Sequence, residues 1–285
     1  MERVAIITDS ASDLTAADAA ASGVRIVPLY VRFGEEEFRA GVDLSTGEFW
    51  ARMVAPDAPF PTTAAASPGD FQAAFEEELA NGAKAIVCVT VGGKLSATFK
   101  SAELAAQALR GEEIHVVDSS SASMGVGLLA LLGAELAADG LPASEIASTL
   151  RGRVGDIDLY VALDTLEYLR KAGRMSAARA AIGSVLSVKP IITVTDGEVD
   201  TADRVRTRSK ARERVLELLT ARPVERIAIL YTPPADADAA AFGQEVFARL
   251  PGGVDAGHAT TAVVGPSVGP HIGPGCLGAV VLLRR

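Results

Sequence analysis

The sequence predicts an α/β protein with two domains: an N-terminal domain built on a Rossmann-like parallel sheet, and a C-terminal α+β domain with a mixed or antiparallel sheet. In the first half of the chain, short β-branched runs alternate with longer amphipathic segments, which is typical of βαβ units. In the second half, strand-like runs follow one another with few helical segments between them. The length of 285 residues also corresponds to about two average domains.

The first domain, residues 1–155, is predicted to contain four strands and four helices between them. The helix beginning at Pro68 has the clearest signals, because Ser67 is a favoured N-cap, proline suits the first helical position, and Asn81-Gly82 ends the pattern. Phe33–Asp43 is predicted to be an exposed hairpin or turn. The strands are Arg3–Thr8, Ile26–Val31, Ala85–Val91 and Ile114–Asp118, and the helices are Thr15–Ser22, Pro68–Asn81, Ser96–Leu109 and Ser123–Ala138.

The second domain, residues 156–285, follows a helix predicted over Ala143–Arg151. Asp196-Gly197 is a typical two-residue hairpin turn, and Ser209–Thr220 is the one clear helix. The boundary near residue 155 is approximate, and the prediction permits segments of one domain to pack in the other. The predicted strands are Leu159–Leu163, Ser187–Val194, Glu198–Val205, Arg226–Tyr231 and Leu277–Leu283.

Composition excludes several classes of protein. Asp and Glu number 36 against 27 Lys and Arg, and the formal net charge of -9 argues against a nucleic-acid partner, because phosphates require a positive surface. Cys88 and Cys276 lie far apart, which suggests neither a disulfide framework nor a zinc site and fits a reducing cytoplasm. The longest apolar stretch, Met124–Ala134, is shorter than the ~20 residues that span a membrane.

Three motifs resemble enzyme signatures only in part. Gly265–Gly269 has the G-x-S-x-G spacing of a hydrolase elbow around Ser267, but the elbow needs a following helix, and the run Gly269–Gly275 is predicted not to be helical. Gly125–Ala130 stands too far from a strand end for a dinucleotide turn, and Gly92–Ser96 lacks the order of a phosphate loop. We therefore expect no cofactor and no metal, since the histidines are also isolated.

Hydroxyl groups mark two predicted junctions between a strand and a helix. Thr62-Thr63 precede the helix at Pro68, and Lys94–Thr98 follow the strand Ala85–Val91. Ligands of open parallel sheets bind beyond the carboxyl ends of the strands, where helix N-termini favour anions. These residues therefore form either a carboxylate or phosphate site or ordinary helix caps.

Basic residues offer two further candidates. His271 lies among glycines and prolines in a loop that would present its imidazole to a ligand. Arg204, Arg206 and Arg208 alternate and would share one face of a strand. An arginine on such a face either makes two parallel hydrogen bonds to a carboxylate or is simply solvated.

Taken together, the motifs resemble the DegV family in order and spacing over essentially the whole chain. The segments that carry the resemblance are Ile6–Leu14, Pro61-Thr62-Thr63, Ser67–Phe71, Lys94–Thr98, Val117-Asp118-Ser119, Ser123–Gly127, Tyr168–Arg174, Lys189–Ile192, Val205-Arg206-Thr207 and Gly269–Gly275.

The resemblance implies a non-catalytic protein that binds one long-chain, palmitate-like fatty acid in a buried tunnel. It further implies that some members carry the acyl chain for a bacterial fatty acid kinase, whose separate subunit binds ATP, and it allows transient contact with a membrane surface. The resemblance also implies which residues bind the carboxylate: Thr63, Ser96 and His271, with Thr62 beside them. Arg206 would lie nearby and contact the kinase or the phosphoryl group.

Some positions depart from the family's usual pattern. Ala64-Ala65-Ala66 stands where Ser-Gln-Pro is usual, Gly92-Gly93 where serines are common, and Ala97 in place of glycine. These changes would alter the surroundings of the carboxylate. The main hypothesis is a fatty-acid carrier for a kinase. The alternatives are a serine hydrolase that uses Ser267 or Ser96 with His271, and a regulatory module whose ligand controls association with another protein.

Overall fold

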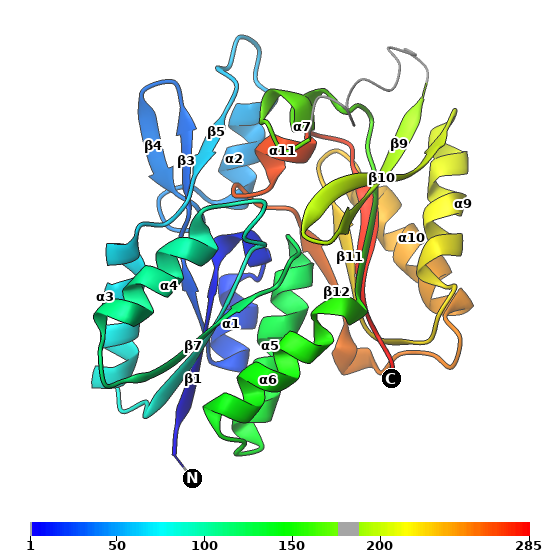
Figure 1. Cartoon of the computed structure of the whole chain (residues 1–285). Coiled ribbons are helices and arrows are strands. Elements are labelled where there is room, and N and C mark those ends of the chain that lie inside the picture. The colour runs from blue at the N-terminus through cyan, green and yellow to red at the C-terminus, as the bar shows by residue number, and fades with distance from the viewer. Residues whose placement is uncertain (1, 176–187) are drawn as a thin grey trace.

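The described part of the chain forms three sheets with helices packed on and between them, which confirms the predicted α/β class (Figure 1). The computed structural model describes residues 2–175 and 188–285. None of the helices within these two ranges combines the length and apolar character needed to cross a bilayer.

The first sheet is parallel, with the order β2-β1-β6-β7. Its two central strands, β1 and β6, are almost entirely buried, which explains their continuous apolar sequences. Helices α3 and α4 cover one face, and α5 and α6 cover the other (Figure 1). The bounds are β1 Val4–Asp9, α1 Ala16–Ser22, β2 Val24–Val27, α3 Pro68–Ala80, β6 Ala85–Thr90, α4 Thr98–Ala108, β7 Glu113–Asp118, α5 Met124–Ala138 and α6 Ala143–Arg153.

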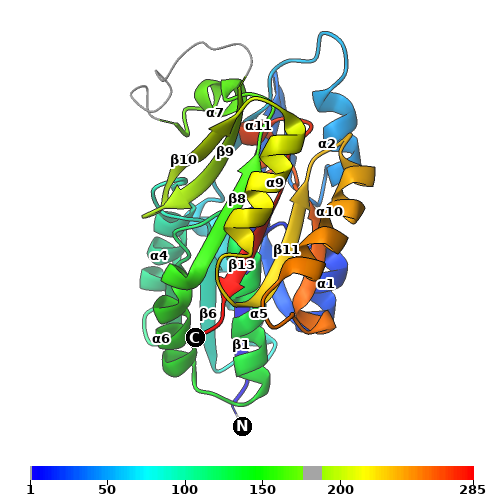
Figure 2. The ribbon, with the colours of Figure 1, turned by 90° about the vertical axis from the view of Figure 1, so that its right-hand side faces the viewer.

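The second sheet is mixed, with the order β10-β9-β8-β13-β11-β12. Only β11 and β12 pair in parallel, and α9 and α10 pack on the outer face (Figure 2). The predicted Asp196-Gly197 turn joins β9 and β10, and both residues have positive φ angles. The bounds are β8 Ile157–Ala162, α7 Glu167–Lys171, β9 Lys189–Thr195, β10 Glu198–Val205, α9 Arg208–Leu219, β11 Val224–Tyr231, α10 Asp236–Arg249, β12 Ala259–Val263, α11 Gly269–Ile272 and β13 Leu277–Leu283.

Helix α5 joins the two sheets, because it contacts β1 and β6 on one side and β11 and β13 on the other. Side chains alternate along β13: Val280 and Leu282 enter the core shared with the first sheet, whereas Val281 packs under α9 and α10. Buried Arg226 on β11 also makes two hydrogen bonds to Glu135 on α5, of 2.6 and 2.5 Å. One core thus spans both sheets, and the two-domain division near residue 155 stays a prediction.

The third sheet corrects one prediction. The apolar run predicted as a single strand, Ile26–Val31, is divided at Pro28, which has no N–H to donate to a ladder. Residues before the proline belong to β2 and those after Leu29 belong to β3, in another sheet. The predicted hairpin within Phe33–Asp43 is confirmed as the antiparallel pair of β3 and β4. The bounds are β3 Tyr30–Phe33, β4 Glu36–Arg39, α2 Thr46–Met53 and β5 Thr62–Ala64.

Other differences concern the ends and the loops. The prediction that Gly269–Gly275 is not helical is wrong for its first four residues, which form α11 with Pro270 in the first turn, where proline is tolerated. Helix α4 begins two residues later than predicted. The predictions omitted α2, β5, α7, α10 and β12, so Thr62-Thr63, predicted as a turn at a strand-to-helix junction, lie instead on a strand of the third sheet. The first residue of the predicted strand Ser187–Val194 lies outside the described residues.

Candidate functional site

The fold brings the carboxyl ends of β1 and β6 together at the centre of the parallel sheet. From β1 the chain runs to β2 on one side, whereas β6 is the neighbour of β1 on the other side, so the order of the strands reverses here. Ligands of open parallel sheets bind at such a switch point. The Asp9 carboxylate at the end of β1 accepts hydrogen bonds from the backbone N–H groups of Ala11 and Val91, both at 2.8 Å. These bonds fix the loops that leave the two strands.

A mostly apolar pocket lies at this point. Its walls come from the loops after β1, β2, β6 and β7, the inner face of the second sheet, strand β5, helix α7 with the residues that follow it, and the segment around α11. Most of the lining side chains are aliphatic, namely Leu29, Val91, Leu95, Leu159, Val161, Leu169, Ile192, Val194, Val199, Leu230, Val264, Val268 and Ile272. An apolar ligand would fit this wall.

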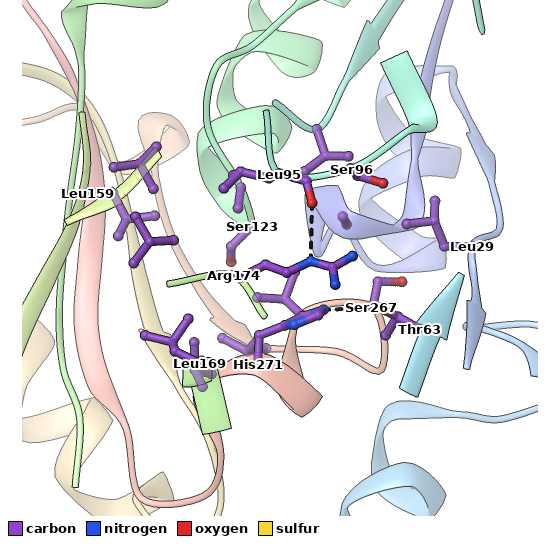
Figure 3. A pocket seen from close by; sticks show the side chains of 18 of the residues that line it. Leu29, Thr63, Leu95, Ser96, Ser123, Leu159, Leu169, Arg174, Ser267 and His271 are labelled. Atoms are coloured by element: carbon purple, nitrogen blue, oxygen red, sulfur yellow. Dashed lines mark hydrogen bonds between the residues drawn. The ribbon is translucent and has the colours of Figure 1, made fainter. Parts of the chain in front are cut away.

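Thr63 and His271 form a polar pair in the pocket wall. Strand β5 carries Thr63 and α11 carries His271, and the Thr63 Oγ1 and His271 Nε2 atoms lie 3.1 Å apart (Figure 3). Burial, aided by the positive charge of Arg174, lowers the pKa of the His271 imidazole to about 4, so the ring is neutral at pH 7. When Nε2 carries the ring proton, it donates to Thr63, and the Thr63 hydroxyl is left to donate to a ligand.

The other ring nitrogen of His271 supports a polar ligand at this point. Nδ1 is buried and has no hydrogen-bond partner among the described residues. A buried polar atom without a partner is costly, so such atoms generally mark a place for water or a ligand.

Ser96 and Arg174 complete a set of donors. The Ser96 hydroxyl lies 2.8 Å from that of Thr98 and accepts the Thr98 backbone N–H, so it caps α4. When Thr98 donates to Ser96, the Ser96 hydrogen is free for a ligand. The Arg174 guanidinium extends into the pocket and donates through Nε to the Leu95 carbonyl oxygen at 3.3 Å (Figure 3). Two hydroxyls and a cation therefore line the same pocket, and such groups suit an anion.

A second carboxyl group lies buried behind the pocket. Asp13 accepts hydrogen bonds from the Ser123 hydroxyl at 2.5 Å and from the Gly265 N–H at 2.8 Å. Burial raises the pKa of Asp13 to about 7 and that of Asp9 to about 6. Asp13 thus connects the loops that carry Ser123 and Ser267 to the end of β1.

The structure places the predicted site residues in two groups. Thr63, Ser96 and His271 all line the pocket. Thr62 is exposed on β5, and Arg206 is exposed just after β10, and neither belongs to the lining. Thr62 and Arg206 are therefore candidates for contacts at the surface rather than inside the pocket.

The departure at Gly92-Gly93 has a packing reason. A Cβ atom on Gly92 would lie 3.2 Å from backbone atoms of Ser120 and Ser121, and one on Gly93 would lie 2.9 Å from the Asp118 carboxylate. The loop that carries Ser96 therefore packs directly against the loop after β7. Ala97 is exposed and makes no side-chain cap, a role that Ser96 fills instead.

Hydrolase chemistry is not favoured by these contacts. Within the described part of the chain, the His271 imidazole makes its hydrogen bond to Thr63, and the Ser267 hydroxyl makes its bond to Ser10 at 2.8 Å. A serine nucleophile needs a base within hydrogen-bond reach. Although α11 supplies a short helix after Ser267, neither Ser267 nor Ser96 bonds to the imidazole.

Sequence reasoning omitted Arg174 as a site residue. Arg170 and Lys171 precede it closely, and such a group of cations on an exposed segment is typical of a solvated surface. Only the fold reveals that its side chain enters the pocket beside His271. The useful signal would have been its place within Tyr168–Arg174, one of the segments that carry the family resemblance.

Comparison with known proteins gives a consistent result. The family model described as uncharacterised protein, DegV family, matches residues 3–284. A DegV domain-containing protein of Deinococcus radiodurans is 36% identical over 282 residues, with 98% of each chain covered. One from Streptomyces coelicolor is 34% identical over 285 residues, with 99% of each chain covered.

Several solved structures with the same fold are described as binding fatty acids. A DegV family protein from Thermus thermophilus is 35% identical with a TM-score of 0.88, and 99% of this chain and 100% of that chain are covered. DegV from Bacillus subtilis, described as a fatty acid binding protein, is 28% identical with a TM-score of 0.88 over all of both chains. A stearic acid-binding protein from Eubacterium ventriosum is 26% identical with a TM-score of 0.88, and 99% and 98% are covered.

Proposed function

The chain belongs to the DegV family, and on this premise we propose that it binds one long-chain fatty acid in the pocket and presents the carboxylate to a separate ATP-dependent kinase. The observation that carries the proposal is the polar group of Thr63, Ser96, His271 and Arg174 in a pocket whose wall is mostly aliphatic. This arrangement matches a ligand with one anionic end and a long apolar chain.

The carboxylate is the costly part of such a ligand. Removing an anion from water without hydrogen bonds costs several kcal/mol. The Thr63 and Ser96 hydroxyls supply uncharged donors, and Arg174 supplies the compensating charge. Because His271 is neutral at pH 7, it adds no second cation and serves to orient Thr63.

The acyl chain supplies the favourable free energy. Each methylene group transferred from water to the aliphatic wall contributes about 0.8 kcal/mol. The chain would lie along the inner face of the second sheet, where Leu159, Val161, Ile192 and Leu230 line the pocket. Affinity therefore grows with chain length until the pocket is filled.

Presentation to a kinase explains why the carboxylate site is not sealed. Arg174 is exposed, and Thr63 and Ser96 are only partly buried, so a partner can approach the head group. In the proposed reaction, a carboxylate oxygen attacks the γ-phosphorus of ATP on the partner, ADP leaves, and an acyl phosphate forms. This chain holds the nucleophile and needs no cofactor of its own. Exposed Arg206 would contact the kinase or the transferred phosphoryl group.

A reconstituted kinase reaction tests the proposal. Protein loaded with palmitate is mixed with ATP and the ATP-binding subunit of a bacterial fatty acid kinase, and acyl phosphate is trapped as the hydroxamate. We expect palmitoyl hydroxamate only when all three components are present, and about tenfold less with Arg206→Glu, the size of one charge-assisted contact. Bound palmitate is measured in both proteins, so that loss of ligand is recognised. Binding of palmitate without any acyl phosphate would refute the kinase role but not fatty-acid binding.

A further inference from the structure

A second polar group lies in the pocket wall and is not used by the carboxylate site. Ser267 lines the pocket and its side chain is buried, with 4% of the residue exposed. Its hydroxyl lies 2.8 Å from that of Ser10, which also accepts the backbone N–H of Leu29 at 2.8 Å. A buried hydroxyl in an aliphatic wall lowers the affinity of the pocket for a plain hydrocarbon chain, unless the hydroxyl has a hydrogen-bond partner.

The Ser267 hydroxyl can donate a hydrogen bond to a ligand. The two serine hydroxyls carry two hydrogens, and only one of them can lie between the two oxygens. When Ser10 donates to Ser267, the Ser267 hydrogen is left to face the pocket. The other buried hydroxyl of the wall, Ser123, is already committed to Asp13. Ser267 can therefore donate its hydrogen to a ligand when Ser10 donates to Ser267.

The position of Ser267 indicates where on a ligand its partner would lie. The segment around α11 begins its helical turns before Ser267, as shown by the 2.8 Å hydrogen bond from Gly269 N–H to the Gly265 carbonyl. Ser267 precedes α11 by two residues, and both Ser267 and His271 line the pocket. Figure 3 shows both at the same side of the pocket as Thr63.

We propose that the pocket selects long-chain fatty acids with a hydroxyl group on the second or third carbon, and that Ser267 donates a hydrogen bond to this hydroxyl. The inference rests on the fatty-acid binding proposed above and adds the ligand class. With the carboxylate at Thr63 and Ser96, the first carbons of the chain pass beside Ser267, whereas later carbons meet only the aliphatic wall. Beside an unsubstituted chain, Ser267 donates to Ser10 and makes no hydrogen bond to the ligand.

Competitive binding to delipidated protein tests this selection. Affinities of palmitate, 2-hydroxypalmitate, 3-hydroxypalmitate and 16-hydroxypalmitate are measured by displacement of a fluorescent fatty acid. We expect 2- or 3-hydroxypalmitate to bind about three- to tenfold more tightly than palmitate, the size of one net hydrogen bond. The 16-hydroxy acid, with its hydroxyl at the far end, gains nothing. In Ser267→Ala the ratio of affinities for the hydroxylated and plain acids falls to about one.

The control is Ser148→Ala on the exposed surface of α6, which is expected to keep the wild-type ratio. Equal affinity of wild-type protein for palmitate and for both the 2- and 3-hydroxy acids overturns the inference while leaving fatty-acid binding intact. A preference that survives in Ser267→Ala overturns the role of Ser267. If none of the four acids binds, the proposed function fails and this inference fails with it.

Discussion

Palmitate affinity is expected to fall by about 100-fold or more when Thr63→Val and Ser96→Ala are combined, because each hydrogen bond to a charged group contributes about 1.5–3 kcal/mol. Valine preserves the shape and β-branching of Thr63 on β5. Alanine at position 96 removes the hydroxyl together with its bond to the Thr98 N–H, whose effect on stability is measured separately by unfolding. The loss therefore reports the two hydroxyl donors rather than a change of packing. Each single variant is expected to lose about tenfold.

The matched control is Ser148→Ala with Thr149→Val, the same two changes at exposed neighbouring positions on α6. Binding is measured by titration calorimetry at pH 7.5, and thermal unfolding of every variant confirms the fold. Retention of wild-type affinity by a folded Thr63→Val, Ser96→Ala protein would show that the carboxylate binds elsewhere.

The second large effect is expected from Val161→Phe, which narrows the pocket. Val161 is buried on β8, pairs with Ile192 on β9, and both line the pocket. A phenyl ring there takes the room of about two methylenes, so palmitate should bind about 15-fold more weakly at ~0.8 kcal/mol for each. Laurate, which is four carbons shorter, should lose much less, and the preferred chain length therefore becomes shorter.

Val161→Ala provides a test in the opposite direction. The smaller side chain widens the pocket at position 161, so the preferred acyl chain should become longer, toward stearate and beyond. Affinities for the acids from 12 to 20 carbons are compared in the three proteins. An identical length profile in all of them would mean that the acyl chain does not pass Val161.

The central sheets could be predicted from sequence because their signals are local. β1 and β6 are short apolar runs buried on both faces, and α3 has a capping box between Ser67 and Asp70 with proline in its first turn. β12 was missed because Ala259–Val263 has two threonines and no large apolar residue. α10 was missed although Phe242 and Val246 are four residues apart on its buried face, a helical spacing that was readable.

The site was less accessible to sequence reasoning, because its parts are distant in the chain. Thr63 and His271 are 208 residues apart, and no periodicity predicts that they meet. Their selection depended on the family resemblance, because the residue pattern alone favoured helix capping as the explanation of Thr63. The entry of Arg174 into the pocket depends on the path of the chain after α7. The short helix α11 has too few residues to leave a pattern.

Mass spectrometry of the lipid released from the denatured, purified protein tests the central claim most directly. Wild-type protein is expected to release about one long-chain fatty acid per chain, either as purified or after incubation with a mixture of fatty acids. The Thr63→Val, Ser96→Ala protein should release much less under the same conditions. Folded wild-type protein that yields no fatty acid in either case would contradict the claim that this pocket is a fatty-acid site.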